Sequence, residues 1–490
     1  MSRFPIIYHA LRWLSFAFLS AVLFACNGDS KTSETHPEDA PQVDVVQGSG
    51  HFLNLSDIHF NAFYDPDLVE ELYNADPSAW NLIFERSTIT QADGSRDTNY
   101  PLLNSFLTSA QKRIAKPDFI LISGDFIAHD YQYNDHSLIS GFAQKAEIEK
   151  NQWHANFIRK TLQYMAGEFH TRFPGVPVIP ALGNSDAYCG DYHVQPGGSF
   201  LSDLTPIWAS ILPDDKGTFE RTFPKNGYYA LDAPFNPDGI RLIVLNTILF
   251  SEKFNSDVHD FFCQPGHFGS EDEAPGKEML AWVENEIKAM KPAQQAWLIL
   301  HIPPGNDPNS CSGKGFYKQA FNRELIDLYV RNHESITASF AGHYHRDDWR
   351  VIADGGFPLE FIHIGPAITT SYGNNPGYQI VQYDPQSGAL DDYSTYFTNL
   401  ESPTENPTWE VEYNFRESYP GYALQAASLM ELHDRIAKSG ELQNAYNDYY
   451  SGRPDAKHLA PKFWAHVCAQ TNLSVAGFNA CMAIEGRECH

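Results

Sequence analysis

Charged residues, and basic residues above all, are scarce in this 490-residue chain. Asp, Glu, Lys and Arg together make up only 19% of it, which excludes a coiled coil or a charged-tail protein. Lys and Arg number 34 against 61 Asp and Glu, so the formal net charge is −27. Because nucleic acids and anionic membrane surfaces are bound through basic footprints, unaided binding to either is not expected. Hydrophobic residues reach 42%, which excludes a wholly disordered chain.

The N-terminus also lacks a hydrophobic run long enough to cross a bilayer. Its apolar stretch, LSFAFLSAVLFA, is far shorter than the ~20 residues that span a membrane. Arg3 and Arg12 flank it without any acidic residue, which is typical of a signal peptide over residues 1–26. The four residues ending at Cys26 resemble a bacterial lipobox, so Cys26 is a lipidation candidate; plain cleavage and a retained anchor are the alternatives. Residues 27–50 are polar and predict a flexible tether.

This N-terminus predicts an exported protein in the bacterial periplasm or at the cell surface, with secretion as the alternative. A lipid anchor would then be the only contact with a membrane. Export agrees with the cysteines, since an even set remains besides Cys26 and no Cys-x-x-Cys pair suggests a zinc knuckle. Spacing alone cannot pair the remaining six, which are Cys189, Cys263, Cys311, Cys468, Cys481 and Cys489.

Short apolar runs alternate with amphipathic stretches from about residue 51, a pattern typical of an α/β fold around a buried sheet. Strands are expected at 51–57, 118–125, 176–184, 241–246, 296–305 and 336–345, and antiparallel strands at 359–365 and 378–384. Helices are expected at 102–115, 277–290, 317–331 and 423–450. The strand signals thin out after about residue 385. This change divides the chain into a catalytic domain at 51–385 and a helical, disulfide-containing region at 386–490.

Polar clusters follow five of the expected strands, at the end where α/β sheets place their ligand sites. Asp-x-His and His-x-His let alternate residues of an extended segment point the same way. Each motif alone is more often a surface or core accident, but five in this order are not. Together they offer oxygen and imidazole donors for two divalent ions, zinc or alternatively manganese or iron. The candidate ligands are Asp57, His59, Asp125, Asn184, His301, His343 and His345.

The order of these motifs resembles the calcineurin-like metallophosphoesterases, and within them the acid sphingomyelinase family with its sphingomyelinase-like phosphodiesterases. The resemblance covers residues ~50–490 and rests on LNLSDIHFN, ISGDFIAHD, ALGN, RLIVLNT, LHIPPG, AGHYHRDDW, AITTSYGNNPGY, DDYSTYFTNL and YNFRESYPG. It implies a four-layer αββα sandwich with a C-terminal helical subdomain. It also implies hydrolysis of a small phosphorylated substrate, a phosphodiester or a phosphoanhydride, by a metal-bound hydroxide.

The resemblance further implies a role for each candidate. Asp57, His59 and His345 would bind one metal, Asn184, His301 and His343 the other, and Asp125 would bridge the two. His129 would protonate the leaving oxygen. Cys263 and Cys311 resemble one family disulfide and Cys468 and Cys481 another, which leaves Cys189 and Cys489 as partners or free thiols.

Ser185 departs from the family pattern, because a histidine that contacts the scissile phosphate usually follows the metal-binding Asn. A serine cannot donate a proton as an acid at neutral pH. Its presence therefore favours substrates with better leaving groups, such as nucleotides and other phosphoanhydrides, over sphingomyelin. A polyphosphatase and a degenerate metal-binding surface lipoprotein are the rival readings. Ser185 and Tyr378 are weak substrate-binding candidates, and Tyr188, Tyr192 and Tyr372 either line a groove or serve core packing. A monomer that binds no nucleic-acid duplex is expected.

Overall fold

The computed structural model describes residues 48–94, 96–131, 147–254, 272–452, 462–484, 486–487 and 489. All of them belong to one compact unit, Pro41–His490. The predicted signal peptide 1–26, the lipidation candidate Cys26, the tether up to residue 47 and Cys263 lie outside the described residues.

One six-stranded sheet carries the N-terminal strands, in the order β12-β11-β10-β1-β2-β3. Strands β1, β2 and β3 are parallel, and β10 runs antiparallel to both β1 and β11. The apolar, fully buried sequences of β1 and β2 are typical of strands covered on both faces. The strands are β1 (Gly50–Leu55), β2 (Ile120–Ile122), β3 (Val178–Pro180), β10 (Gly377–Tyr383), β11 (Leu390–Phe397) and β12 (Glu410–Asn414).

A second six-stranded sheet has the order β4-β5-β6-β7-β9-β8. Its central strands β5, β6, β7 and β9 are parallel, and β4 and β8 are antiparallel edges. The two strands expected to be antiparallel, β9 and β10, lie in different sheets. Strand β10 is antiparallel to both of its neighbours, whereas β9 is antiparallel to β8 but parallel to β7. The strands are β4 (Tyr229–Ala233), β5 (Asn236–Val244), β6 (Gln295–Ile299), β7 (Ile336–Ala341), β8 (Asp348–Asp354) and β9 (Phe357–Ile364).

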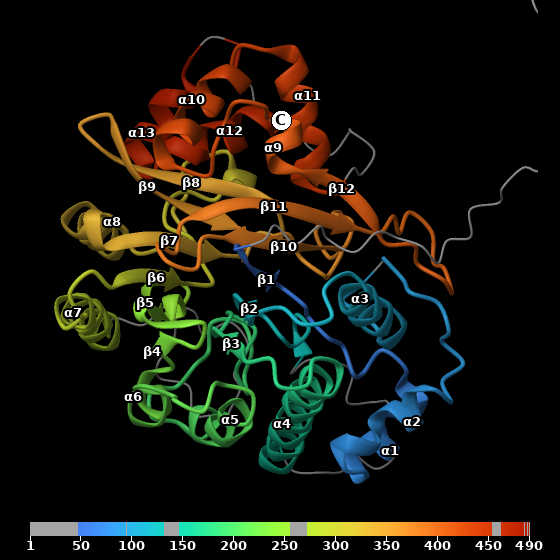
Figure 1. The fold of residues 1–490 in the computed structure, drawn as a ribbon. Helices are drawn as coiled ribbons and strands as arrows, with labels where there is room; N and C mark the ends of the chain where they lie inside the picture. Colours follow the sequence, from blue (N-terminus) through green and yellow to red (C-terminus); the bar gives the residue numbers. More distant parts are fainter. Residues whose placement is uncertain are drawn as a thin grey trace, which may run out of the picture. The chain divides into compact units, whose positions relative to one another are not determined.

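The two sheets pack face to face through aromatic side chains. The ring of Phe52 in β1 lies 5.7 Å from that of Trp297 in β6 and 5.5 Å from that of Phe340 in β7. Helices cover the outer faces: α3 and α4 lie beside the first sheet and α7 and α8 beside the second (Figure 1). These helices are α3 (Tyr100–Arg113), α4 (Glu147–Arg172), α7 (Ala274–Lys288) and α8 (Gln319–Asn332). The predicted four-layer αββα sandwich is therefore confirmed.

Further helices lie outside these layers. The helices α5 (Ser199–Ala209) and α6 (Phe219–Asn226) pack on each other near α4, and α1 (Val69–Asn74) and α2 (Trp80–Phe84) are short. None of the helices in the described ranges combines the length and hydrophobicity that a bilayer-spanning segment requires.

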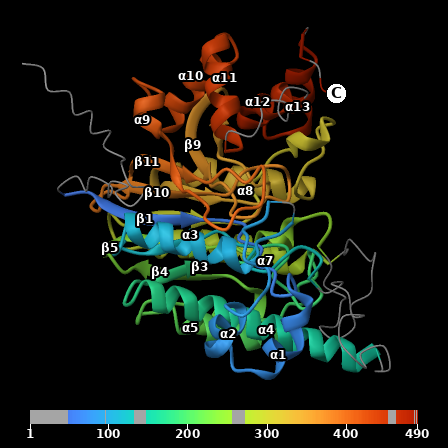
Figure 2. The same cartoon turned by 90° about the vertical axis from the view of Figure 1, so that its right-hand side faces the viewer.

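The C-terminal helices gather on one side of the sandwich, next to β8 and β9 (Figures 1 and 2). The helix expected over 423–450 is broken into two at residues 437–439. The sheet also continues past residue 385, because β11 and β12 pair with β10 and with each other. The helices are α9 (Phe415–Ser418), α10 (Ala426–Ile436), α11 (Gly440–Tyr450), α12 (Phe463–Thr471) and α13 (Val475–Met482).

Disulfides tie the C-terminal region together. The expected Cys468–Cys481 bridge is present. The expected Cys263–Cys311 bridge is wrong, because Cys311 pairs with Cys489 across 178 residues. The loop around Cys311 packs on the tail, where the side-chain amide of Asn306 donates to the carbonyl of Asn472 over 2.9 Å. Cys489 is thus no free thiol, and Cys189 is disulfide-bonded as well.

Candidate active site

The seven predicted metal ligands all lie just beyond the carboxyl ends of parallel strands. Asp57 and His59 follow β1, Asp125 follows β2 and Asn184 follows β3, while His301 follows β6 and His343 and His345 follow β7. Parallel strands end at a common edge of each sheet, so the two packed sheets bring these loops together although they span almost 290 positions.

The backbone of these loops is unusual. Five of the candidates have positive φ, which costs a non-glycine residue about 1–2 kcal/mol. The angles are 48° at Asp57, 47° at His59, 57° at Asp125, 82° at His343 and 60° at His345. The expectation of extended Asp-x-His and His-x-His segments is therefore wrong. Strained, left-handed turns aim these side chains, a form of strain that concentrates at functional sites.

Asp125 lies at the centre of the cluster. Its Oδ2 is 3.3 Å from His59 Nε2 and 3.2 Å from His301 Nε2. On one side, Asp57 Oδ1 is 3.4 Å from His345 Nε2. On the other, Asn184 Oδ1 is 3.0 Å from His301 Nε2. The structure thus brings six of the seven candidates into two adjoining groups that share the carboxylate of Asp125.

His343 lines the same site from the second sheet. Its ring centroid is 5.1 Å from that of His301, and its backbone N–H donates to the carboxylate of Asp57, 3.0 Å from Oδ2. Tyr192 approaches its Nε2, with the hydroxyl oxygen 3.4 Å away. All seven candidates therefore meet.

Backbone carbonyls orient two of the imidazoles. His59 Nδ1 lies 3.0 Å from the carbonyl of Ile127, and His301 Nδ1 lies 2.8 Å from that of Ser123. A carbonyl can only accept, so each Nδ1 carries the proton and each Nε2 is directed at Asp125. The unprotonated Nε2 atoms of His59 and His301 and the carboxylate of Asp125 are all electron-rich and buried together. They therefore repel one another unless a cation lies among them. A proton can play that part, since burial lowers the pKa of His301 but the charge of Asp125 raises it to about 9.

Several buried nitrogens have no hydrogen-bond partner within the described residues. They are His59 Nε2, His343 Nδ1 and both ring nitrogens of His345. Buried polar atoms are normally paired, and unpaired ones call for an explanation such as an ion. Imidazole nitrogens mixed with carboxylate and amide oxygens are the donors that borderline divalent metals bind. The residues present therefore fit divalent metal ions.

His129, the predicted proton donor, stacks on His59 with the ring centroids 3.7 Å apart. A residue that sequence reasoning missed, Asp97, holds it. Asp97 accepts from the backbone N–H of His129 over 2.7 Å and faces its Nδ1 at 2.9 Å. Thr369 and Ser371 also donate to Asp97. Burial would raise the pKa of Asp97, but the hydrogen bond from His129 and the nearby histidines lower it to about 2.

Asp186 is a second carboxylate with a positioning role. It is fully buried and accepts from the backbone N–H groups of Asp125, Phe126 and Gly183, each over 2.9 Å. It thereby ties the loop after β2 to the loop after β3. Its neighbour Ser185 is also buried and donates its backbone N–H to Asp125 Oδ1 over 2.7 Å. The residue that replaces the family histidine thus lies directly beside the central carboxylate.

The tyrosines separate into two groups. Tyr378 has no exposed surface, and its ring packs against Phe106, Tyr396 and Trp409. The prediction that Tyr378 contacts substrate is therefore wrong. In β10 its side chain is on the face of the sheet that packs against α3, so it lies in the core. Tyr188 is buried too, with its hydroxyl on Asp203.

Tyr192 and Tyr372, by contrast, line a cavity of about 480 Å³ next to the site. Its walls include His343 and Phe316, whose rings are 5.1 Å apart. The ring of Tyr372 is 57% exposed and contacts His345 edge-on. This cavity offers room for the substrate beyond its scissile group.

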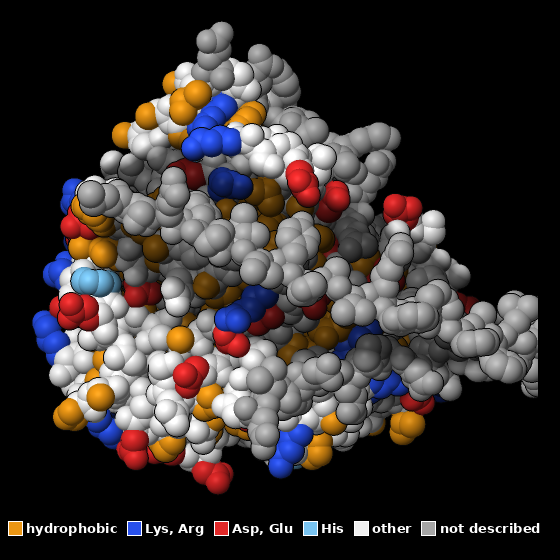
Figure 3. Space-filling view, turned by 45° about the horizontal axis from the view of Figure 1, so that its top comes forward, with side chains coloured by type: hydrophobic (Ala, Val, Ile, Leu, Met, Phe, Trp, Pro, Cys, Tyr) orange, Lys and Arg blue, Asp and Glu red, His pale blue; other side chains and the backbone are white. Residues whose placement is uncertain are grey.

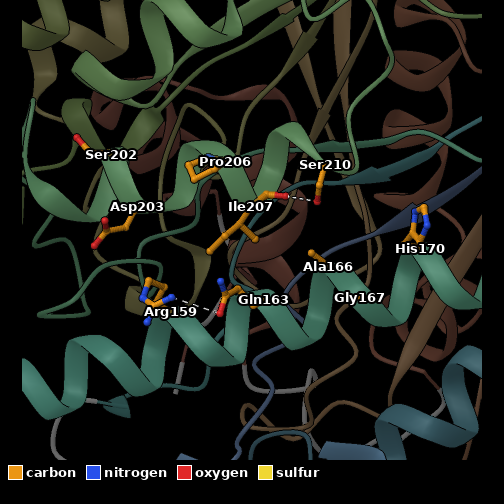
Figure 4. Close-up of a pocket in the computed structure, with 10 residues that line it drawn as sticks. All are labelled: Arg159, Gln163, Ala166, Gly167, His170, Ser202, Asp203, Pro206, Ile207 and Ser210. Atoms are coloured by element: carbon orange, nitrogen blue, oxygen red, sulfur yellow. Dashed lines mark hydrogen bonds between the residues drawn. The ribbon is translucent and has the colours of Figure 1, made fainter. Parts of the chain in front are cut away.

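Other surface features lack the chemistry of the site. On the face shown in Figure 3, basic and acidic side chains are interspersed rather than gathered by sign. A groove of about 600 Å³ lies between α4 and α5, lined by residues such as Arg159, His170 and Asp203 (Figure 4). None of the seven candidate ligands lines that groove.

Comparisons with known proteins agree with this geometry. Residues 50–347 match the calcineurin-like phosphoesterase family, so the chain belongs to these metal-dependent hydrolases. Residues 360–488 match the acid sphingomyelin phosphodiesterase C-terminal region, which places the chain in the acid sphingomyelinase-like branch.

The relatives point to the same branch. The chain is 25% identical to human acid sphingomyelinase-like phosphodiesterase 3b, over 89% of this chain and 91% of the relative. It is 28% identical to sphingomyelinase phosphodiesterase D of Dictyostelium discoideum, over 73% and 74%. It is 27% identical to the mouse cyclic GMP-AMP phosphodiesterase SMPDL3A, over 66% and 72%. The predicted family and enzyme class are confirmed.

Proposed function

We propose that this protein is an exported phosphodiesterase that uses two divalent metal ions as cofactors, with zinc as the preferred assignment. Asp57, His59 and His345 would hold one ion, Asn184, His301 and His343 the other, and Asp125 both. The observation that carries the proposal is the meeting of these donors around one buried carboxylate, with imidazole nitrogens left without partners. Manganese and iron are the alternative ions.

Bound metals would supply Lewis-acid stabilisation of the phosphate oxygens and lower the pKa of an attacking water. The protein's own groups supply the rest. Carbonyls fix the imidazoles of His59 and His301, and Asp186 holds the loop of Asp125. His129, oriented through Nδ1 by Asp97, holds a proton on its other nitrogen for the leaving oxygen.

The substrate is a small phosphate compound with a phosphodiester or phosphoanhydride bond, such as a nucleotide or a phosphocholine-type ester. Relatives named for sphingomyelin and for cyclic GMP-AMP support this range. Ser185 favours good leaving groups, because its hydroxyl cannot act as a second acid. For the same reason a polyphosphatase is the second candidate. The proposed enzyme is a monomer that binds no nucleic-acid duplex.

Export rests on the N-terminal sequence and on the disulfides, which persist in oxidising compartments. The proposed location is the bacterial periplasm or the cell surface, with a lipid on Cys26. Cys26→Ala should shift the full chain from the membrane fraction to the soluble fraction. A variant that stays membrane-bound would contradict lipidation.

Metal analysis and a substrate panel test the activity directly. Purified protein should contain close to two equivalents of divalent metal and should hydrolyse bis(p-nitrophenyl) phosphate, ADP or a p-nitrophenyl phosphocholine ester. Chelation should abolish turnover, and zinc or manganese should restore it. No turnover of mono-, di- and polyphosphates by metal-loaded protein would instead favour the degenerate binding protein.

A further inference from the structure

The cavity beside His343 is cationic, although the chain as a whole is strongly acidic. Three lysines line it from separate parts of the chain. Lys253 follows the short helix Thr247–Phe250, Lys314 lies in the loop before α8, and Lys462 precedes α12. None of the three forms an ion pair within the described part of the chain.

The other charged groups of the cavity leave this excess standing. The guanidinium of Arg346 donates to the carbonyls of His345 and Tyr372, over 3.0 and 2.7 Å. Asp307 accepts from the backbone N–H of Asn309 over 2.9 Å and keeps its charge, so the lining holds two carboxylates against three lysines and Arg346. Glu252 is exposed and is the remaining carboxylate of the lining. The cavity therefore attracts anions.

Lys253 lies one aromatic ring away from the candidate metal ligand His343, and Lys314 belongs to the loop that carries a second ring packed on His343. The ammonium of Lys253 lies 4.7 Å from the ring centre of Tyr192, whose hydroxyl approaches His343. Lys314 is two positions before Phe316, which packs edge-on against the His343 ring. The three lysines thus line the same cavity as His343, one of the candidate metal ligands.

The tail holds two of these lysines in place. The carbonyl of Lys314 accepts from the N–H of Asp307 over 2.8 Å, and the same loop carries the Cys311–Cys489 disulfide. Lys462 donates to the carbonyl of Asn309 over 3.0 Å, which leaves two of its three N–H bonds free. The cationic wall is thus built in advance of ligand binding.

We propose that Lys253, Lys314 and Lys462 form a subsite for a second anionic group of the substrate, so that the enzyme prefers compounds with an oligophosphate chain. The inference rests on the proposed function and narrows it. A choline headgroup carries a positive charge that the lysines repel, whereas a neighbouring phosphate gains a charge-assisted hydrogen bond. Nucleoside polyphosphates and inorganic polyphosphate share this chemistry.

Substitution of the two lysines nearest His343 tests the subsite. In the metal-loaded enzyme, Lys253→Gln and Lys314→Gln should each raise KM for ADP and for inorganic tripolyphosphate about fivefold, the upper range for an exposed charge pair. The double variant should weaken the salt dependence of KM. KM for bis(p-nitrophenyl) phosphate, which has no second anion, should stay within about twofold. Equal effects on all three substrates would overturn the subsite.

Lys116→Gln is the matched control, because this exposed lysine precedes β2 and so lies at the opposite end of the strand from Asp125. It should change none of the three values. The comparison of ADP with tripolyphosphate distinguishes nucleoside polyphosphates from inorganic polyphosphate as substrates. An enzyme that recognises nucleotides should have a higher kcat/KM for ADP, whereas a polyphosphatase should not.

A binding measurement separates the subsite from the proposed activity. Calorimetry with α,β-methylene-ADP or methylenediphosphonate, under excess Mg²⁺, needs no turnover. Weaker binding to the double variant would support the subsite even if none of the substrates were hydrolysed. That combination of results would refute the proposed function but not the subsite. Equal binding to the double variant and the unaltered protein would refute the subsite.

Discussion

The pair Asp97 and His129 yields the sharpest prediction about the reaction. Asp97→Asn keeps the shape of the side chain and the acceptor for the His129 N–H, but removes the negative charge beside Nδ1. The imidazolium form of His129 is then less stable, and the ring is free to turn. The variant should protonate leaving oxygens poorly while binding substrate as before.

The structure sets the size of this effect. The pKa of Asp97 falls from its ordinary 3.8 to about 2, a net stabilisation of the carboxylate by about 2 kcal/mol. His129 is its main favourable partner, with His59 and Ser371 adding to it. Asp97 is 92% buried, so solvent screens little of this interaction. General-acid catalysis contributes typically about 10²–10⁴-fold, and the variant loses part of it, so we expect kcat to fall at least about 10-fold for substrates with poor leaving groups.

The assay compares an alkyl phosphodiester with its p-nitrophenyl counterpart. Nitrophenolate leaves without help, so Asp97→Asn should lower kcat for that ester less than threefold. Asp354→Asn, at the exposed end of β8, is a control that should change neither rate. One nitrogen of His129 also lies within 4.8 Å of ring nitrogens of His59 and His345, so metal content must be measured. Equal losses on both esters, or loss of metal, would refute the assignment of His129 as proton donor.

Three more predictions follow from the site and the core. Asp125→Asn should remove at least one metal equivalent and lower kcat at least 100-fold; full activity with unchanged metal content would contradict the bridging role. Ser185→His should accelerate hydrolysis of alkyl diesters, because it restores an acid beside Asp125; an unchanged rate would show that His129 suffices. Burial raises the pKa of Glu360 to about 8, so the native protein retains a proton that the unfolded chain releases above about 4.5. Glu360 should therefore contribute a loss of roughly 1 kcal/mol of stability for each pH unit from about 5 to 8, and Glu360→Gln should reduce the pH slope of thermal unfolding by that amount.

The sheet strands and the convergence of the ligands were predictable because both depend on local signals. An apolar strand followed by a polar cluster marks the carboxyl edge of an α/β sheet, and five such clusters point to one edge. The edge strands β4 and β8 were missed, and so were β11 and β12, whose sequences, LDDYSTYF and EVEYN, mix charged and aromatic residues. Only pairing with β10 and with each other makes β11 and β12 strands, and those contacts are tertiary.

The supporting residues show the limit of sequence reasoning. Asp97 lies in a loop between α2 and α3 with no motif around it, and it meets His129 only because both loops cross the same edge. Asp186 did carry a signal, because it belongs to the polar cluster after β3, two residues beyond the candidate ligand Asn184. The pairing of Cys311 with Cys489 depends on where the tail docks, which spacing does not encode. The positive φ angles at Asp57 and His345 likewise arise from the fold around them.

The division of the chain into a catalytic part and a helical tail does not hold for the site itself. Asp348, three residues after His345, accepts from Tyr446 in α11 over 3.1 Å and from Gln470 in α12 over 2.8 Å. The N–H of Asp347 donates to the carbonyl of Tyr450 over 3.1 Å. Because His343 and His345 both have strained backbones, their loop needs such outside contacts to keep its form.

The same tail carries Lys462 and clamps the loop of Lys314, so it also shapes the cavity beyond His343. A chain cut after the last strand would lose the support of the histidine loop and one wall of the cavity together. The C-terminal helices therefore support both the loop of His343 and His345 and the wall of the neighbouring cavity.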